Sequence, residues 1–130
     1  MSIAAHNPAG VFPPYRSYAH AVEVPAGART LYISGLNGFE PDGVNMPSDF
    51  ESQAALVWRH LGTILDSAGM GYTDLVSLRF FLASAADDPA NVEILSSHLD
   101  GHLAARSVIV QQLLEPRWLI EVEAIAAKVD

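Results

Sequence analysis

An arginine and two glutamates near the C-terminal end have the residue types best suited to chemistry. Arg106 stands at the start of the apolar run 107–110, where a guanidinium group is costly to bury without a partner. Two interpretations are open. In the first, Arg106 pairs with an acidic neighbour or faces solvent, and this interpretation is favoured for an arginine considered alone. In the second, its planar guanidinium is held ready to bind a carboxylate ligand.

Glu121 and Glu123 lie two residues apart in the apolar segment 119–125. In a β-strand this spacing places both carboxylates on one face, where like charges repel and burial opposes ionisation. A solvated outer face, with Ile120 and Val122 pointing inward, explains the pattern as well as a functional acidic pair does.

Familiar catalytic and metal-binding motifs are absent from the sequence. It contains no Gly-x-Ser-x-Gly, Walker A, Gly-x-Gly-x-x-Gly or His-Glu-x-x-His pattern. His98 and His102 have the helical spacing of two metal ligands. Because Gly101 indicates that the helix ends before His102, we interpret the two as a surface pair and expect no metal site.

Composition and charge restrict the class of protein. The 130 residues suit a single domain, 1–130, and with half of them hydrophobic and 17% charged they exclude a disordered chain. A net charge of −8, with seven scattered basic residues, argues against nucleic acid as a partner. No apolar run approaches the ~20 residues that span a bilayer, and segment 1–10 lacks the features of a signal peptide. Without cysteine, we expect a soluble protein of the cytoplasm.

Apolar periodicity and chain-breaking residues predict the secondary structure. Residues 1–17 form an irregular lead-in and 36–47 a loop. The predicted strands are 18–24, 30–34, 74–82, 107–110 and 118–126, and the predicted helices are 48–68 and 88–99.

Both helices carry signals at their ends. Ser48 and Glu51 have the spacing of a capping box, and Gly69 predicts a left-handed end to the first helix. Asp88 and Pro89 supply an N-cap and a first-turn proline for the second. The apolar stripe of the first helix comprises Phe50, Ala54, Val57, Leu61, Ile64 and Ala68.

This element order predicts an α+β fold, with one mixed sheet of five or six strands and two helices packed on one face. The first helix forms a crossover between the second and third strands, and the outer strand pairs are antiparallel. The other face also needs cover, because Val22, Leu31, Leu78 and Val110 cannot all face the helices. A symmetric oligomer would supply that cover.

Several segments, in this order and spacing, resemble one known family. They are Tyr-Ala-His-Ala-Val at 18–22, Ile-Ser-Gly at 33–35, Ile-Leu-Asp-Ser-Ala-Gly at 64–69, Asp-Leu-Val at 74–76, Ala-Arg-Ser at 105–107 and Ile-Glu-Val-Glu-Ala-Ile-Ala at 120–126. From residue 18 onward the chain is similar to the RidA/YjgF family of reactive-intermediate enamine/imine deaminases, also described as endoribonuclease L-PSP. The resemblance implies a chorismate-mutase-like fold, a homotrimer with active sites between subunits, and no cofactor. The implied reaction is hydrolysis of 2-imino or 2-enamino acids to 2-keto acids and ammonia.

The resemblance also implies roles for particular residues. Arg106 would bind the substrate carboxylate, and Glu121 would hold the attacking water and carry its proton to the leaving nitrogen. Tyr18 would close the cleft, Ser34 would add a hydrogen bond, and backbone groups up to Val108 would hold the imine nitrogen. A further substrate-binding position on the second helix falls on Asn91 or, in a shifted alignment, on Glu93.

The sequence departs from the family pattern at Leu36, Ala104 and Val108, where the family has glutamine, proline and often cysteine. With Phe39 and Trp118, Leu36 hints at a more apolar pocket, although packing explains each equally well. Two alternatives therefore accompany the imine deaminase. One is a specialised pathway enzyme on the same scaffold, such as a 2-aminomuconate deaminase, and the other is a non-catalytic keto-acid-binding protein. A ribonuclease is the weakest interpretation, given the net charge of −8.

Overall fold

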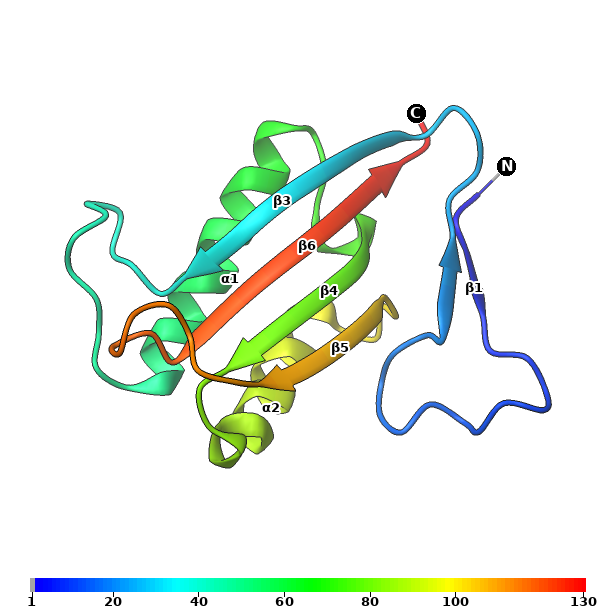
Figure 1. Ribbon diagram of the computed structural model, residues 1–130. Coiled ribbons are helices and arrows are strands. Elements are labelled where there is room, and N and C mark those ends of the chain that lie inside the picture. The colour runs from blue at the N-terminus through cyan, green and yellow to red at the C-terminus, as the bar shows by residue number, and fades with distance from the viewer. Residues whose placement is uncertain (1) are drawn as a thin grey trace.

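The computed structural model describes residues 2–130 and contains one main sheet of four strands (Figure 1). The strand order is β3-β6-β4-β5, in which β4 and β5 are parallel and β6 is antiparallel to both of its neighbours. The strands are β3 (Arg29–Asn37), β4 (Leu75–Leu82), β5 (Ala105–Val110) and β6 (Ile120–Lys128).

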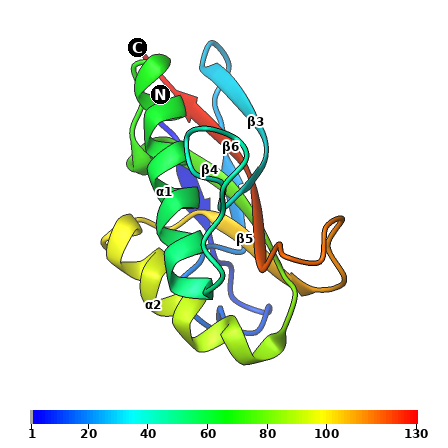
Figure 2. The same ribbon diagram turned by 90° about the vertical axis from the view of Figure 1, so that its left-hand side faces the viewer.

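Two helices, α1 (Phe50–Ser67) and α2 (Asp88–Leu99), cover one face of this sheet. Figure 1 shows α1 behind β3 and β6 and α2 behind β4 and β5, and Figure 2 shows both helices on the same side of the sheet. Single 3-10 turns, Tyr72–Asp74 and Ala85–Asp87, precede β4 and α2. The prediction of an α+β fold with two helices on one face is confirmed. The single sheet of five or six strands is instead a main sheet of four strands and a separate sheet of two. No helix within residues 2–130 is long and apolar enough to cross a membrane.

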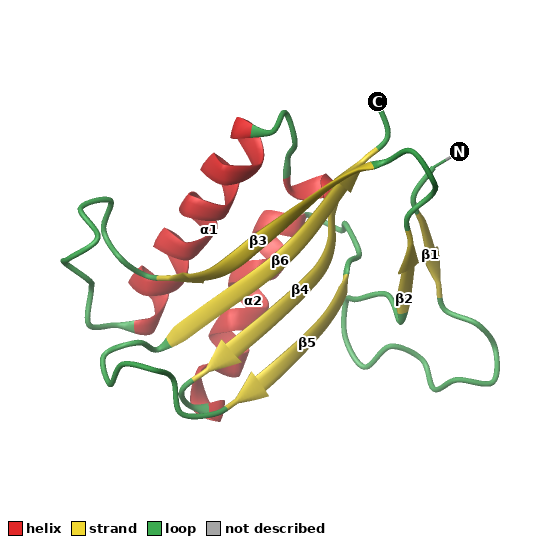
Figure 3. Ribbon diagram, turned by 45° about the horizontal axis from the view of Figure 1, so that its top comes forward, coloured by secondary structure: helices red, strands yellow, loops and turns green. Residues whose placement is uncertain are grey.

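The remaining strands, β1 (Ala4–His6) and β2 (Ala21–Glu23), form a separate antiparallel ribbon (Figure 3). The strand predicted at 18–24 is therefore shorter, and the segment 1–17, expected to be irregular, contains β1. The reason lies at Ala19, whose N–H donates to the Ala104 carbonyl at 3.0 Å and which forms a bridge with Ala105. This contact draws residues 18 and 19 to the edge of β5 and leaves only 21–23 for the ribbon.

The prediction that the outer strand pairs are antiparallel neighbours is wrong. β2 pairs with β1 rather than β3, and β6 lies between β3 and β4 rather than beside β5. Burial explains the central place of β6, because its helix-facing side chains before the terminal Lys128 are all apolar and nearly all inaccessible. They are Ile120, Val122, Ala124 and Ala126, with 0–4% exposure.

Asp49, rather than the predicted Ser48, caps helix α1. Its carboxylate accepts a hydrogen bond from the Ser52 N–H at 3.0 Å. Because the helix begins one residue later than predicted, Glu51 is too close to the cap to complete a capping box with Ser48. The helix ends as predicted, with Gly69 in the left-handed region at φ 70°.

Helix α2 also begins differently at its cap. Asp87 takes the N-cap position without a side-chain hydrogen bond, and Pro89 lies in the first turn as predicted. Asp88, the predicted cap, instead forms an ion pair with Arg16 at 2.7 Å. The Asp88 carboxylate therefore binds Arg16, in a distant segment, rather than capping the first turn of α2.

The core fills the space between the helices and the sheet. On α1 the predicted stripe is buried at Phe50, Ala54, Val57 and Leu61 and only partly buried further along. The largest apolar side chains that are fully buried include Trp58, Leu65, Phe80, Leu82 and Leu95. This packing holds β4 and β6 rigidly under both helices.

The apolar residues from which we predicted that the second face of the sheet is covered do not lie on that face. Leu31 is in register with Ala126 and Leu78 with Ala124, so both point toward the helices. Val110 is in register with Leu82 on the same side. Val22 lies outside the main sheet, in the ribbon.

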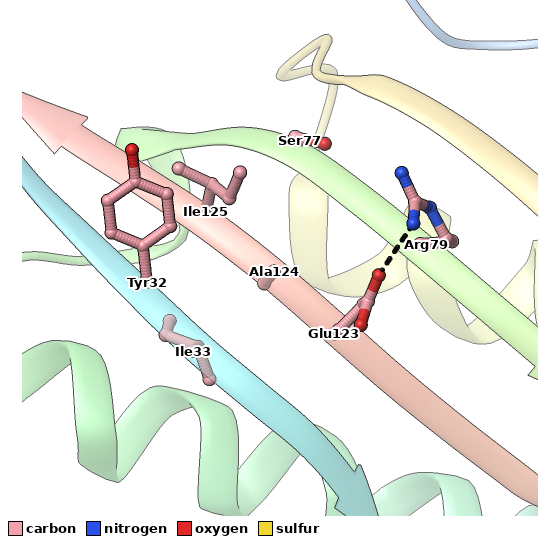
Figure 4. A pocket seen from close by; sticks show the side chains of 7 residues that line it. All are labelled: Tyr32, Ile33, Ser77, Arg79, Glu123, Ala124 and Ile125. Atoms are coloured by element: carbon pink, nitrogen blue, oxygen red, sulfur yellow. Dashed lines mark ion pairs between the residues drawn. The ribbon is translucent and has the colours of Figure 1, made fainter.

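The face of the sheet without helices, here called the open face, is nevertheless partly apolar. Its centre holds an ion pair between Arg79 and Glu123, with an N–O distance of 2.9 Å (Figure 4). Tyr32, in register with Ile125 beside this pair, is 78% exposed. The register places Phe81 and Ile109 on the same face. A large exposed aromatic ring on a flat sheet is typical of a contact surface.

Gln53 connects the loops that precede α1 and β6. Its side chain is fully buried, and its Nε2 donates to the carbonyls of Pro47 at 2.8 Å and Arg117 at 2.9 Å. Its Oε1 accepts from the Leu119 N–H at 2.9 Å. The bonds to Arg117 and Leu119 fix the path of the chain into β6, and the bond to Pro47 ties that path to the loop before α1.

Replacing Gln53 with leucine should destabilise the fold by about 2 kcal/mol, because the backbone groups of Arg117 and Leu119 lose their buried partners. Urea denaturation measures this change. Arg59→Leu, at an exposed position of the same helix, should alter the unfolding free energy by less than about 0.5 kcal/mol. Equal stability of the two variants would contradict the role given to Gln53.

Candidate active site

Arg106 lies on β5, at the edge of the sheet, and its side chain is half-buried. Its Nε donates a long hydrogen bond, 3.4 Å, to the Ser17 carbonyl, and its Cζ lies 5.4 Å from the centre of the Tyr18 ring. The Nη2 atom is buried and has no hydrogen-bond partner within residues 2–130. Burial lowers the pKa of Arg106, and the nearby positive charge of Arg16 lowers it further. A guanidinium in this state is well suited to an anionic partner.

Tyr18 belongs to a short segment that crosses the edge of β5. Its hydroxyl accepts from the Tyr15 N–H at 3.1 Å, and its ring meets the His20 ring edge to face. The backbone contact between Ala19 and Ala104 fixes the segment next to Arg106. The structure therefore brings Tyr18 and Arg106 together within one chain.

A cavity of about 240 Å³ opens beside these two side chains. Val108 also lines this cavity. It lies two residues after Arg106 on β5, and alternate residues of a strand share a face. The complete lining is Tyr15, Arg16, Tyr18, Asp88, Arg106 and Val108. Two cationic, two aromatic and one acidic side chain thus border this space, with Val108 beside them.

Glu121 lies on the open face of the sheet, near the start of β6. Asn37 Nδ2 donates to its Oε1 at 3.3 Å and to the Ile120 carbonyl at 3.4 Å. The side chain lies across Gly35, where an added Cβ would stand 2.9 Å from Glu121 Cδ and closer still to Oε2. Gly35 thus makes room for the Glu121 carboxylate. Glu123 pairs instead with Arg79, so the two glutamates have different surroundings.

Within one chain the sheet separates Arg106 from Glu121. Arg106 is in register with Leu78, which is buried beneath the helices, whereas Glu121 is in register with Phe81, on the open face. Glu121 contributes to a different cavity, shared with Phe81 and the residues 111–114. The two residues that the sequence singled out for chemistry are therefore not brought together by the fold of a single chain.

The other predicted site residues lie on different sides of the sheet. Ser34 is exposed on β3, next to Gly35, at an irregularity in the pairing with β6. Asn91 is fully buried on α2, and neither polar atom of its side chain has a partner within the described residues. Glu93 is exposed. Between the two alternatives on α2, Asn91 is thus the one that faces the interior.

The suggestion of a more apolar pocket is not supported by the positions of its residues. Leu36 packs against the core, and Phe39 meets Trp118 edge to face with 6.0 Å between ring centres. None of the three lines the cavity of Arg106 or that of Glu121. Packing therefore accounts for these side chains.

His98 and His102 are not the surface pair that was predicted. The His98 ring stacks on Trp58 with 4.8 Å between centres, and its Nδ1 donates to the Ile94 carbonyl. His102 donates separately to the Leu75 carbonyl at 2.7 Å. Across residues 2–130, no group of three or more histidine and acidic side chains could hold a metal ion.

Three residues near these groups were missed by the sequence analysis. Arg16 and Asp88, 72 residues apart, form their ion pair in the wall of the Arg106 cavity. Asn37 holds Glu121. Arg16 could have been noticed as a charged residue two positions before Tyr18, but no local sequence pattern pairs it with Asp88.

The mixed sheet, the two helices on one face and the edge-strand arginine define a chorismate-mutase-like fold with a candidate acid-binding site. The chain belongs to the RidA/YjgF family, since residues 11–128 match the family described as endoribonuclease L-PSP. It is 34% identical to a rat 2-iminobutanoate/2-iminopropanoate deaminase over 113 residues, covering 86% of this chain and 80% of that protein. The goat protein of the same name is 30% identical over 125 residues, covering 95% and 86%.

Solved structures agree with this assignment. A Yersinia pestis protein of unknown function, YyfB of the conserved Rid family, superposes with a TM-score of 0.85 and 32% identity, covering 98% of this chain and 100% of that chain. RidA from the Antarctic bacterium Psychrobacter sp. superposes with a TM-score of 0.73 and 27% identity, covering 88% and 90%.

Replacing Gly35 with alanine should push the Glu121 carboxylate away from Asn37. Because the obstacle is the end of a flexible side chain, the unfolding free energy should change by less than about 1 kcal/mol. A crystal structure of the variant would reveal the displacement, and denaturation would measure the stability. Gly71→Ala, where an added Cβ meets nothing within 4 Å, is the matched control. An unmoved Glu121 in Gly35→Ala would refute the close packing of these two residues.

Proposed function

We propose that this protein hydrolyses 2-imino and 2-enamino acids to 2-keto acids and ammonia, without a cofactor. The observation that carries the proposal is the half-buried guanidinium of Arg106, whose Nη2 lacks a partner within residues 2–130 and which borders a small cavity. Curated relatives at 30–34% identity are named as deaminases of 2-iminobutanoate and 2-iminopropanoate. Both compounds carry a carboxylate next to the carbon that water attacks.

Arg106 would bind that carboxylate through two parallel hydrogen bonds, each worth roughly 1.5–3 kcal/mol as a charge-assisted bond. The Tyr18 ring, already 5.4 Å from the guanidinium carbon, would pack against the bound acid. Past its bridge with Ala19, the outer edge of β5 has no strand beside it in the described chain. Backbone groups near Val108 are thus available to the imine nitrogen.

Glu121 would activate the water. Its carboxylate takes a proton as the water oxygen bonds to C2, and it then delivers that proton to the nitrogen. This gives a carbinolamine, whose hydroxyl proton passes through the same carboxylate to the nitrogen as the C–N bond breaks. The C2 carbonyl then forms and ammonia leaves, so one water is consumed for each ammonia released. Asn37 holds Oε1, which leaves Oε2 over Gly35 for the water.

Two copies of the chain must contribute to such a site. The sheet separates Arg106 from Glu121 in one chain, so the Glu121 that meets a substrate on Arg106 comes from a neighbouring copy. The exposed Tyr32 on the open face is suited to contact between copies. The family resemblance favours a homotrimer. In this assembly Ser34 would accompany Glu121, and Asn91 would support the Arg106 side of the cleft.

Keto-acid binding without catalysis is the second candidate. The observation that favours it is that the Arg106 cavity forms without Glu121. A binding protein needs the arginine but not the acid, so the two functions differ in what happens when Glu121 is neutralised.

Turnover of freshly generated 2-iminopropanoate, followed as keto acid and ammonia released, tests the proposal. Arg106→Ala should reduce the rate to background, and Glu121→Gln should abolish turnover yet still bind pyruvate, because it removes only the proton acceptor. Gly35→Ala should fall between Glu121→Gln and the wild type, with Gly71→Ala as its control. Normal turnover by folded Arg106→Ala would sink the proposal, and pyruvate binding without any turnover by the wild type would establish the binding protein.

Mixing two inactive variants tests the shared site. If Arg106→Ala and Glu121→Gln chains are unfolded and refolded together, random assembly restores both residues to about a quarter of the clefts, so about a quarter of wild-type activity should return. Refolding each variant alone is the control. A mixture that stays inactive although mass spectrometry detects mixed oligomers would place both residues in a single-chain site.

A further inference from the structure

The ion pair between Arg16 and Asp88 is unusual among the salt bridges of this chain. Arg16 Nη1 lies 2.7 Å from Asp88 Oδ2, and the two side chains are 35% and 27% exposed. The other three ion pairs within residues 2–130 are each more exposed, from 41% to 68%. Partial shielding makes this pair less sensitive to solvent than an ordinary surface salt bridge.

The pair joins two distant parts of the cavity wall. Arg16 belongs to the N-terminal segment, and Asp88 is the first residue of α2. Both line the cavity beside Arg106. The salt bridge therefore closes the wall at a place where no backbone hydrogen bond of the described chain joins the segment to α2.

The groups that touch Arg106 lie between two attachment points. On one side, Ala19 is hydrogen-bonded to Ala104 at 3.0 Å. On the other, Arg16 is held by Asp88. The Ser17 carbonyl and the Tyr18 ring, which contact the guanidinium, are the two residues in between. Without Arg16, the next attachment on that side is the Phe12 carbonyl, which accepts from His20 Nε2 at 2.6 Å. The stretch would then no longer be tied to α2, on the far side of the cavity.

We propose that Arg16 and Asp88 form a clasp that holds the segment 15–18 over Arg106 and so positions the carboxylate-binding guanidinium. Both are positioning residues that act through Ser17 and Tyr18. This inference rests on the proposed function of Arg106 in binding a carboxylate.

The clasp and the electrostatic potential of the cavity predict opposite effects on anion binding when Asp88 is neutralised, so this substitution tests the clasp. Asp88 places a negative charge in the cavity, and Arg16 a second positive one beside Arg106. If only the electrostatic potential mattered, Asp88→Asn would strengthen the binding of an anion. If the clasp matters more, the same substitution weakens binding because the segment loosens.

The experiment measures pyruvate affinity by calorimetry and amide hydrogen exchange across residues 14–20 of the ligand-free protein. Asp88→Asn and Arg16→Gln should each weaken binding by about threefold to fivefold, the range of a partly shielded ion pair. Both should speed exchange in the segment. The double exchange Arg16→Asp/Asp88→Arg keeps the net charge of the cavity and should return both quantities to within about twofold of the wild type.

Arg29→Gln is the matched control, because it breaks a similar ion pair, with Asp130 at 2.6 Å, whose residues do not line the Arg106 cavity. It should change neither quantity. Tighter or unchanged binding in Asp88→Asn, unchanged exchange, or a double exchange that restores neither quantity would overturn the clasp. Failure of the proposed function is distinguishable: wild-type protein would bind no pyruvate, while hydrogen exchange would still report whether the clasp holds the segment.

Discussion

The alternation of side chains along a β-strand is the constraint on which the rest of this structure depends. It directs Arg106 toward the helices and Glu121 toward the open face. A one-residue slip of β4 or β6 would bury Arg79 or the two glutamates beneath the helices, so their register is fixed. A substrate that needs both groups must therefore lie where two copies of the chain meet. The proposed assembly is in this sense a consequence of strand register.

Each of the two groups is supported by a different part of the chain. Around Arg106, the supports are the N-terminal segment and the start of α2. Around Glu121, they are Asn37, Gly35 and the loop that Gln53 holds at the start of β6. Because these supports share no residue, carboxylate binding and water activation would be separable properties in the proposed mechanism.

Much of the fold was predictable because periodicity is a local signal. The helices, the left-handed Gly69 and the mixed sheet follow from residues close together in the sequence. The central place of β6 and the early end of the first predicted strand were not predictable, since they depend on burial and on the distant contact of Ala19 with Ala104. The candidate site divides in the same way. Arg106 was singled out by its residue type and position and Tyr18 by the family resemblance, whereas the pairing of Arg16 with Asp88, 72 residues away, could be seen only in the folded structure.

The side chains that hinted at an apolar pocket have a structural explanation. Leu36 packs against the core and Phe39 against Trp118, and none of the three lines the cavity of Arg106 or that of Glu121 in a single chain. Besides Arg106 and Val108, the cavity beside Arg106 is walled by the ion pair of Arg16 with Asp88 and by two tyrosines. Charged side chains are costly to desolvate against a large apolar group. A small 2-imino acid, which leaves that wall hydrated, therefore suits the cavity better than one with a bulky hydrocarbon side chain.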